Sequence, residues 1–223
     1  MCIRDSLFLT AEDLDKNGME GAKYCCSPPP RDKKSQEAIW LGLKNGTFQV
    51  FSSDHAPYRY DESGKFHSGA NPSFKKIANG VPGLETRLPL LFSEGVMKGR
   101  LTMNEFVALT STNASRIYGL YPRKGSLAIG SDADITIWDP KWERTITQDM
   151  LHDKMDYTPY EGMEVKGWPR TVIIRGRVAG ENEKLKLDRG AGEFLKRTPA
   201  QPRLGPLSSS PLSPSRNFGA NLL

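Results

Sequence analysis

The chain has 223 residues, of which 37% are hydrophobic and 26% are charged, so it can bury a sizeable core and has the composition of an ordinary globular protein. Its formal net charge is +5, but four basic and no acidic residues follow residue 193, which leaves +1 for residues 1–193. A nearly neutral body argues against nucleic-acid binding, and the lack of any apolar run near about 18 residues argues against a transmembrane helix.

The N-terminus and the cysteines are informative in different ways. Residues 1–6, MCIRDS, fit none of the elements predicted after them and resemble a translated sequencing adapter. We predict that they are a non-native leader, that the natural protein begins further upstream, and that this chain is a fragment. The cysteines are Cys2, Cys25 and Cys26, a set with neither a disulfide framework nor zinc spacing, which favours a reducing cytoplasm.

The first half of the chain predicts a strand–helix–strand unit. Residues 7–10 and 24–26 indicate short strands, and three prolines place Ser27 at the rigid end of the second. Asp32 is a predicted N-cap for a helix over residues 33–44, which ends at Asn45-Gly46. The strand predicted next, over residues 47–52, completes a βαβ unit and therefore indicates a parallel sheet.

Polar side chains follow that last strand directly. Phe48, Val50 and Phe51 suit a buried pleated surface, and the strand ends in Asp54 and His55. Active sites of α/β barrels lie at the carboxyl ends of the strands. A turn in which an aspartate caps the next segment is the alternative for such a short pattern.

The following segments alternate between irregular loops and helices. Residues 54–81 show no periodicity, as in a binding loop, and His67 within them is predicted to be a solvated loop residue. Helices are predicted over residues 84–98, 103–109 and 114–120, with Thr102 and Glu105 as a capping box for the second.

After residues 121–124 the pattern changes to short β-hairpins. The predicted strands cover residues 127–129, 134–138, 171–175 and 177–179. We therefore divide the chain into a part of a barrel at residues 7–123 and a β-domain at 124–194, with an irregular excursion at 141–169. Residues 195–223 are rich in proline and serine and predict a disordered basic tail.

Four stretches carry a resemblance to a known family: SSDHAPY, ANGVPGLETRLPLLFSEGV, TSTNASRIYGLYPRKGSLAIGSDADITIWDP and YTPYEG. Together they resemble the C-terminal part of the D-hydantoinase/dihydropyrimidinase family, which are cyclic amidases of the amidohydrolase superfamily. The resemblance covers about residues 7–194. It implies an α/β fold, in which the C-terminal part of a (β/α)8 TIM-type barrel is followed by part of a small β-sandwich.

The resemblance also implies a chemistry and its site residues. Members hydrolyse the cyclic amide bond of dihydropyrimidines or hydantoins to N-carbamoyl amino acids, using a hydroxide bound to two divalent metal ions, usually Zn2+, bridged by a carboxylated lysine. It implies that Asp54 is both metal ligand and catalytic proton carrier, and that Ser27 and Asn79 bind the substrate ring. His55 has a supporting role without binding metal, and the full-length protein is a homotetramer.

The chain lacks the other groups that this chemistry needs. The family's His-x-His pair, further metal histidines and bridging lysine match nothing here, since the chain has only His55, His67 and His152. One carboxylate cannot hold two zinc ions. We therefore expect the 223-residue chain alone to lack hydrolase activity.

Two alternatives stay open beside a ring-opening hydrolase. The collapsin response mediator proteins are non-catalytic scaffolds of the same fold, but they lack the aspartate that Asp54 matches. Allantoinases and dihydroorotases are other cyclic amidases with a similar strand end. Dihydroorotases typically have a histidine after the Asp-His-Ala-Pro motif, where this chain has Tyr58. None of these readings includes a nucleic-acid or membrane partner.

Overall fold

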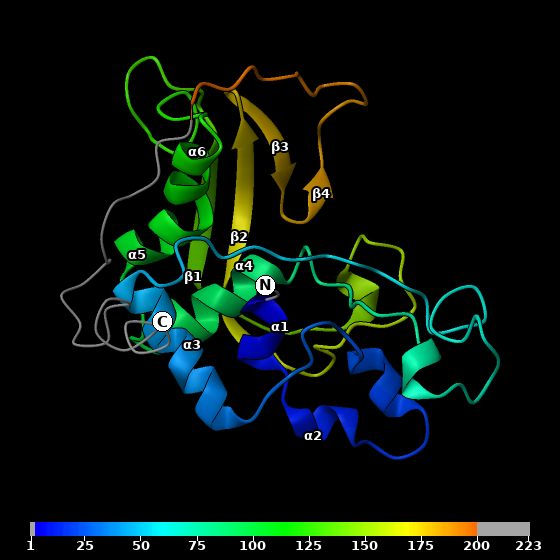
Figure 1. The fold of residues 1–223 in the computed structure, drawn as a ribbon. Coiled ribbons are helices and arrows are strands. Elements are labelled where there is room, and N and C mark those ends of the chain that lie inside the picture. Colours follow the sequence, from blue (N-terminus) through cyan, green and yellow to red (C-terminus); the bar gives the residue numbers. More distant parts are fainter. Residues whose placement is uncertain (1–2, 200–223) are drawn as a thin grey trace. The chain divides into compact units, whose positions relative to one another are not determined.

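A computed structural model of the chain describes residues 3–199, and the outer residues at each end lie outside this range (Figure 1). Most of the predicted tail therefore lies outside the described residues, whereas residues 3–6 are described as the start of a helix, in which Arg4, Asp5 and Ser6 are buried. The structure does not test whether residues 1–6 are native. The described chain divides into two compact units, each made of separate stretches of sequence. Within residues 3–199, no helix is long and apolar enough to cross a membrane.

Of the described residues, the first unit contains 3–42, 51–90 and 144–165 and is mostly helical and irregular. Its buried hydrophobic residues include Leu7, Leu9, Trp40 and Phe51, and the ring of Phe8 meets those of Trp40 and Phe51 edge-on at 6.2 and 6.4 Å. Its elements are α1 (Ile3–Phe8), α2 (Ala11–Leu14), the 3-10 helices η1 (Glu20–Tyr24), η2 (Phe74–Lys76) and η5 (Gln148–Met150), and most of α3 (Lys33–Asn45) and α4 (Arg87–Leu91).

Helix α3 forms where its local signals place it. The carboxylate of Asp32 accepts a 2.8 Å hydrogen bond from the N–H of Ser35, as an N-cap does. The helix ends at Asn45, and Gly46 follows with a φ of +84°, which glycine adopts without steric cost. The predicted helix over residues 33–44 is therefore confirmed to within one residue.

The strands predicted over residues 7–10, 24–26 and 47–52 do not form in the described structure. Residues 7–8 belong to α1, residue 24 ends η1, and residues 47–52 carry no strand pairing. A strand requires a neighbour that takes up its backbone groups. Here a side chain takes that place: the amide of Asn113 donates to the carbonyl of Gln49 at 2.8 Å, while the one parallel bridge described joins Thr10 to Arg31.

Of the described residues, the second unit contains 43–50, 91–143 and 166–199, and it combines helices with a sheet. In its core, Phe92 stacks on Trp138 at 4.4 Å and meets Phe106 edge-on at 5.5 Å. Its elements are the π-helical η3 (Phe92–Met97) and η4 (Ala108–Thr112), α5 (Met103–Val107), α6 (Asn113–Ile117), and the strands β1 (Ile135–Thr145), β2 (Glu164–Ile174), β3 (Arg177–Glu181) and β4 (Lys184–Leu185).

The helical predictions in this unit are only partly correct. The capping box is confirmed: Thr102 Oγ1 accepts from the N–H of Glu105 at 3.2 Å, and Glu105 Oε2 accepts from the N–H of Thr102 at 2.7 Å. The predicted helix over 84–98 begins later, at Arg87, and widens into a π-helix from Phe92. The predicted break near residues 110–113 is a second π-helix rather than a gap.

The sheet has the strand order β1-β2-β3-β4, and Figure 1 labels all of these strands. The hairpin predicted around Gly176 is confirmed, since Ile174 pairs with Arg177 in an antiparallel ladder. Residues 127–129 are not a strand: Leu127 and Ile129 are exposed, and the N–H of Ser131 turns back onto Ala128. The strands β1 and β2 also extend into the predicted irregular excursion, which leaves residues 146–163 outside the sheet.

Candidate functional site

The candidate site residues lie on three chain segments of the first unit that are joined by hydrogen bonds. The N–H of Gly80 donates to the carbonyl of Cys25 at 3.0 Å, which connects the Ser27 segment to the Asn79 segment. The N–H of Ala56 donates to the carbonyl of Val81 at 3.3 Å, which connects the Asp54 segment to the Asn79 segment. Residues far apart in sequence are thereby held on one continuous backbone framework.

A cavity of about 610 Å³ lies between two of these segments and is lined by both Ser27 and Asn79. Most of its other lining residues are apolar or small, among them Leu14, Ala22, Pro29 and Ile77, and neither Asp54 nor His55 is part of the lining. Cys26 also lines it, but burial raises the pKa of this thiol to about 12, so it stays protonated at neutral pH and is a poor nucleophile. A mostly apolar pocket with a few polar groups suits a small organic ligand.

Asp54 is exposed and sits between two anchored positions of its segment. On one side, Arg87 Nη1 donates to the carbonyl of buried Phe51 at 2.6 Å. On the other side, Ala56 is bonded to Val81 at 3.3 Å. The φ of Asp54 is +45°, a left-handed conformation that aspartate and asparagine tolerate better than most residues. The structure thus presents this carboxylate on an extended segment with a left-handed residue at Asp54, rather than at the end of a paired strand.

His55 acts as a hydrogen-bond acceptor that holds the turn of residues 83–84. Its Nδ1 accepts from the N–H groups of Gly83 at 3.1 Å and Leu84 at 3.2 Å. These bonds require an unprotonated Nδ1, which assigns the ring proton of the neutral imidazole to Nε2. Burial, with a contribution from the positive charge of Arg4, lowers the pKa of His55 below its usual value.

Gly80 is required where the Asn79 segment approaches the Asp54 segment. Its φ is +151°, and a Cβ added there would lie 2.5 Å from the Cβ of Ala56 and 2.7 Å from its carbonyl oxygen. Any larger residue would push the two segments apart. The Asn-Gly pair therefore has a steric reason in addition to the resemblance that first indicated it.

Sequence reasoning missed Lys65, which is completely buried and bonded to the segments that contain Ser27 and Asn79. Its ammonium donates to the carbonyls of Cys25, Ala78 and Gly80 at 2.9, 2.8 and 2.7 Å. Lysine is almost always exposed, and residue 65 lies in a polar loop without periodicity, so no sequence signal indicated its burial.

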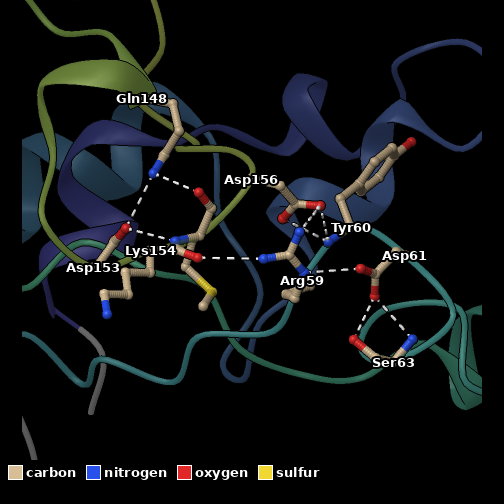
Figure 2. Close-up of polar contacts among 9 residues, drawn as sticks. Arg59, Tyr60, Asp61, Ser63, Gln148, Asp153, Lys154 and Asp156 are labelled. Carbon is tan, nitrogen blue, oxygen red and sulfur yellow. Dashed lines mark hydrogen bonds and ion pairs between the residues drawn. The ribbon is translucent and has the colours of Figure 1, made fainter.

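A second polar network fixes the loop that carries Lys65 (Figure 2). The N–H of Tyr60 donates to both carboxylate oxygens of Asp156 at 3.0 and 3.1 Å, and Arg59 binds Asp61 at 2.9 Å. The Arg59 guanidinium also donates to the carbonyl of Lys154 at 3.4 Å. Residues 59–61 are thereby tied to the segment around residues 154–156.

The described residues do not by themselves fit a metal centre. Within residues 3–199 there is no group of three or more His, Cys, Asp or Glu side chains placed to hold a metal ion. His55 uses Nδ1 for backbone hydrogen bonds, and His152 bonds to Glu85 at 2.9 Å. Asp54 could supply one oxygen ligand, which is too few for a tight site.

Comparison with known proteins places the chain in a family. The amidohydrolase family profile matches residues 1–179, so the chain belongs to the amidohydrolase family. Among curated proteins it is 44% identical over 191 residues to a D-hydantoinase of Ralstonia pickettii, an alignment that covers 86% of this chain and 41% of that protein. The chain therefore spans about two fifths of the length of the curated relatives it matches.

Solved structures agree with this assignment. A D-hydantoinase structure superposes with a TM-score of 0.84 at 42% identity, covering 90% of this chain and 43% of that chain. A dihydropyrimidinase from Brevibacillus agri gives a TM-score of 0.82 at 43% identity, with 88% and 42% covered. The predicted fold class, part of an α/β barrel of the hydantoinase type, is confirmed, although the described residues form almost none of the parallel ladder.

Proposed function

We propose that this chain is the C-terminal part of a hydrolase that opens the cyclic amide bond of hydantoins or dihydropyrimidines to N-carbamoyl amino acids. The observation that carries the proposal is the joining of the Ser27, Asp54 and Asn79 segments by the Cys25–Gly80 and Ala56–Val81 hydrogen bonds. The family and the D-hydantoinase and dihydropyrimidinase relatives give the reaction class.

The substrate ring would bind at the cavity lined by Ser27 and Asn79. A cyclic amide presents alternating N–H and C=O groups in one plane, and backbone and side-chain groups of these two residues can pair with both kinds. The apolar remainder of the cavity would face the ring substituent. This division of polar and apolar contacts is what a pocket uses to orient a small ligand.

Asp54 would serve as the proton carrier of the reaction. Water attacks the ring carbonyl carbon, the C–N bond breaks, and the ring nitrogen must gain a proton as it leaves. A carboxylate can accept the proton from the attacking water and return it to that nitrogen. We also propose that Asp54 supplies one ligand to a divalent metal centre, with zinc as the expected ion, whose remaining ligands come from residues that this chain does not contain.

Two properties of the complete protein belong to the same proposal. By the resemblance, we expect a homotetramer that works in the cytoplasm on a small cyclic amide. Sedimentation of the purified complete protein measures its oligomeric state. Fractionation of the source cells shows whether it lies in the cytoplasm.

The experiment that tests the function uses the complete reading frame that encodes this chain. The purified protein is incubated with hydantoin, dihydrouracil, dihydroorotate and allantoin, and the carbamoyl product is quantified. Turnover of hydantoin or dihydrouracil is the expected result. Turnover of only allantoin or dihydroorotate would assign another cyclic amidase. A folded, metal-loaded protein that opens none of the rings would favour a non-catalytic scaffold.

A further inference from the structure

The ammonium of Lys65 donates to three backbone carbonyls. Nζ lies 2.9, 2.8 and 2.7 Å from the carbonyl oxygens of Cys25, Ala78 and Gly80, and the residue has no exposed surface. An ammonium has three N–H donors and no acceptor, so this arrangement satisfies it fully. Charge-assisted hydrogen bonds of this kind are stronger than those between neutral groups.

The charge is retained at neutral pH despite the burial. Burial lowers the pKa of the Lys65 ammonium to about 8. At pH 7 the side chain is therefore mainly protonated and offers all its donors. Removing a charged ammonium from water costs free energy, so a buried, charged lysine calls for an explanation beyond filling space.

The three carbonyls belong to the segments that carry the candidate ring-binding residues. Cys25 lies two residues before Ser27, and Ala78 and Gly80 flank Asn79 on both sides. Lys65 thus crosslinks the Ser27 and Asn79 segments, which both line the cavity, in addition to the Gly80–Cys25 bond of 3.0 Å.

Lys65 is itself held in place by its loop. Its N–H donates to the carbonyl of Arg59 at 2.8 Å, and Arg59 is fixed by Asp61 at 2.9 Å. The adjacent Tyr60 is bonded to Asp156 at 3.0 Å, as Figure 2 shows. The side chain therefore extends from an anchored backbone rather than from a free loop.

We propose that Lys65 is a positioning residue for the ring substrate, whose ammonium sets the spacing between the Ser27 and Asn79 segments. This inference rests on the ring-binding role of Ser27 and Asn79 given above. Lys65 does not touch the reacting atoms, and it acts through the two segments that it joins.

The test compares Lys65→Met with Lys76→Met in the complete protein at pH 7. Methionine keeps most of the side-chain length and removes the N–H donors, while Lys76 is exposed and does not line the cavity. We expect Lys65→Met to raise KM for hydantoin or dihydrouracil about tenfold or more with little change in kcat, because ground-state binding is lost. We also expect about tenfold faster hydrogen exchange of the Gly80 amide, with the Leu90 amide unchanged.

Each outcome separates the two proposals. Unchanged KM and unchanged Gly80 exchange in Lys65→Met overturn the positioning role while leaving the function intact, provided that the unsubstituted protein opens the ring. If the unsubstituted protein opens none of the rings, the proposed function fails and the positioning role fails with it. If Lys65→Met does not fold, KM and hydrogen exchange of the Gly80 amide are measured on Lys65→Gln instead. Glutamine removes the charge and keeps two N–H donors.

Discussion

The N–H of Gly80 donates a hydrogen bond to the carbonyl of Cys25 at 3.0 Å, and this contact joins two segments that are far apart in the sequence. Ser27 follows one partner closely and Asn79 precedes the other directly. The same cavity is lined by both side chains. This backbone contact therefore holds together the two segments that line the candidate ring-binding pocket.

Replacing Gly80 by alanine tests how tightly this framework is packed. The new Cβ would lie 2.5 Å from the Cβ of Ala56, at a backbone φ of +151° that alanine strongly disfavours. We expect Gly80→Ala to lower the free energy of unfolding by about 1–3 kcal/mol and to raise KM for the ring substrate. Chemical denaturation and steady-state kinetics measure the two effects.

Gly69→Ala is the matched control for that substitution. Gly69 also has a positive φ, +109°, but an added Cβ would meet nothing within 4 Å. Its replacement therefore imposes backbone strain without a collision. Equal effects of the two substitutions on KM would contradict a packing role for Gly80.

The accepting nitrogen of His55 predicts a pH dependence of stability. Because burial lowers the folded-state pKa of His55 below that of the unfolded chain, the unfolded state binds more protons as pH falls below about 6.5. The contribution of His55 to stability is thus fully present above about pH 6.5 and is lost as pH falls through the folded-state pKa of His55. Unfolding free energies measured from pH 8 to pH 5 should show this decline.

Asparagine at position 55 should flatten that decline. Its Oδ1 can accept from the N–H groups of Gly83 and Leu84 in place of Nδ1, and it does not titrate. His67→Asn, which changes an exposed histidine, is the control and should leave the slope unaltered. An equal slope of unfolding free energy against pH in His55→Asn and in the unsubstituted protein would refute the assignment of this pH dependence to His55.

Features set by local chemistry were the ones that sequence could predict. The N-cap at Asp32, the stop at Gly46 and the capping box of Thr102 each depend on a few adjacent residues, and all three are present. Strands depend on a partner elsewhere, and the segment 47–52 fails as a strand because its carbonyls bind side chains instead.

The candidate site also has features that local sequence motifs indicate and others that depend on distant segments. Motifs indicated Ser27, Asp54 and Asn79, but only the structure shows that Ser27 and Asn79 line one cavity from which Asp54 is absent. Lys65 could not be found from sequence, because its burial follows from three carbonyls contributed by distant segments. Such convergence has no periodic signature.

The capping box gives a prediction about stability outside the candidate site. Thr102→Ala removes the hydroxyl that accepts from the Glu105 N–H, so we expect a loss of about 1 kcal/mol. Hydrogen exchange of the Phe106 amide, which donates to the Thr102 carbonyl, should accelerate accordingly. Thr102→Ser keeps the hydroxyl and should restore most of the loss. No difference between the alanine and serine variants would mean that the cap contributes nothing.

The chain on its own should be inactive. Asp54 is the one candidate ligand for the proposed metal centre in the described range, and no cluster of three ligand side chains accompanies it there. We expect the purified 223-residue chain to retain less than one zinc ion after dialysis and to leave dihydrouracil intact. Metal analysis and product detection measure both, and metal-dependent turnover by this chain would be inconsistent with the proposal.

The most direct test of the account is the turnover of hydantoin and dihydrouracil by the complete protein with Asp54→Asn. Asparagine tolerates the left-handed backbone at this position and removes only the charge, so the fold should be kept. We predict that kcat falls by a factor of about 10² or more, as expected for a lost acid–base group, while Glu62→Gln, an exposed acid nearby, has no such effect. Full ring-opening turnover in Asp54→Asn would contradict the account.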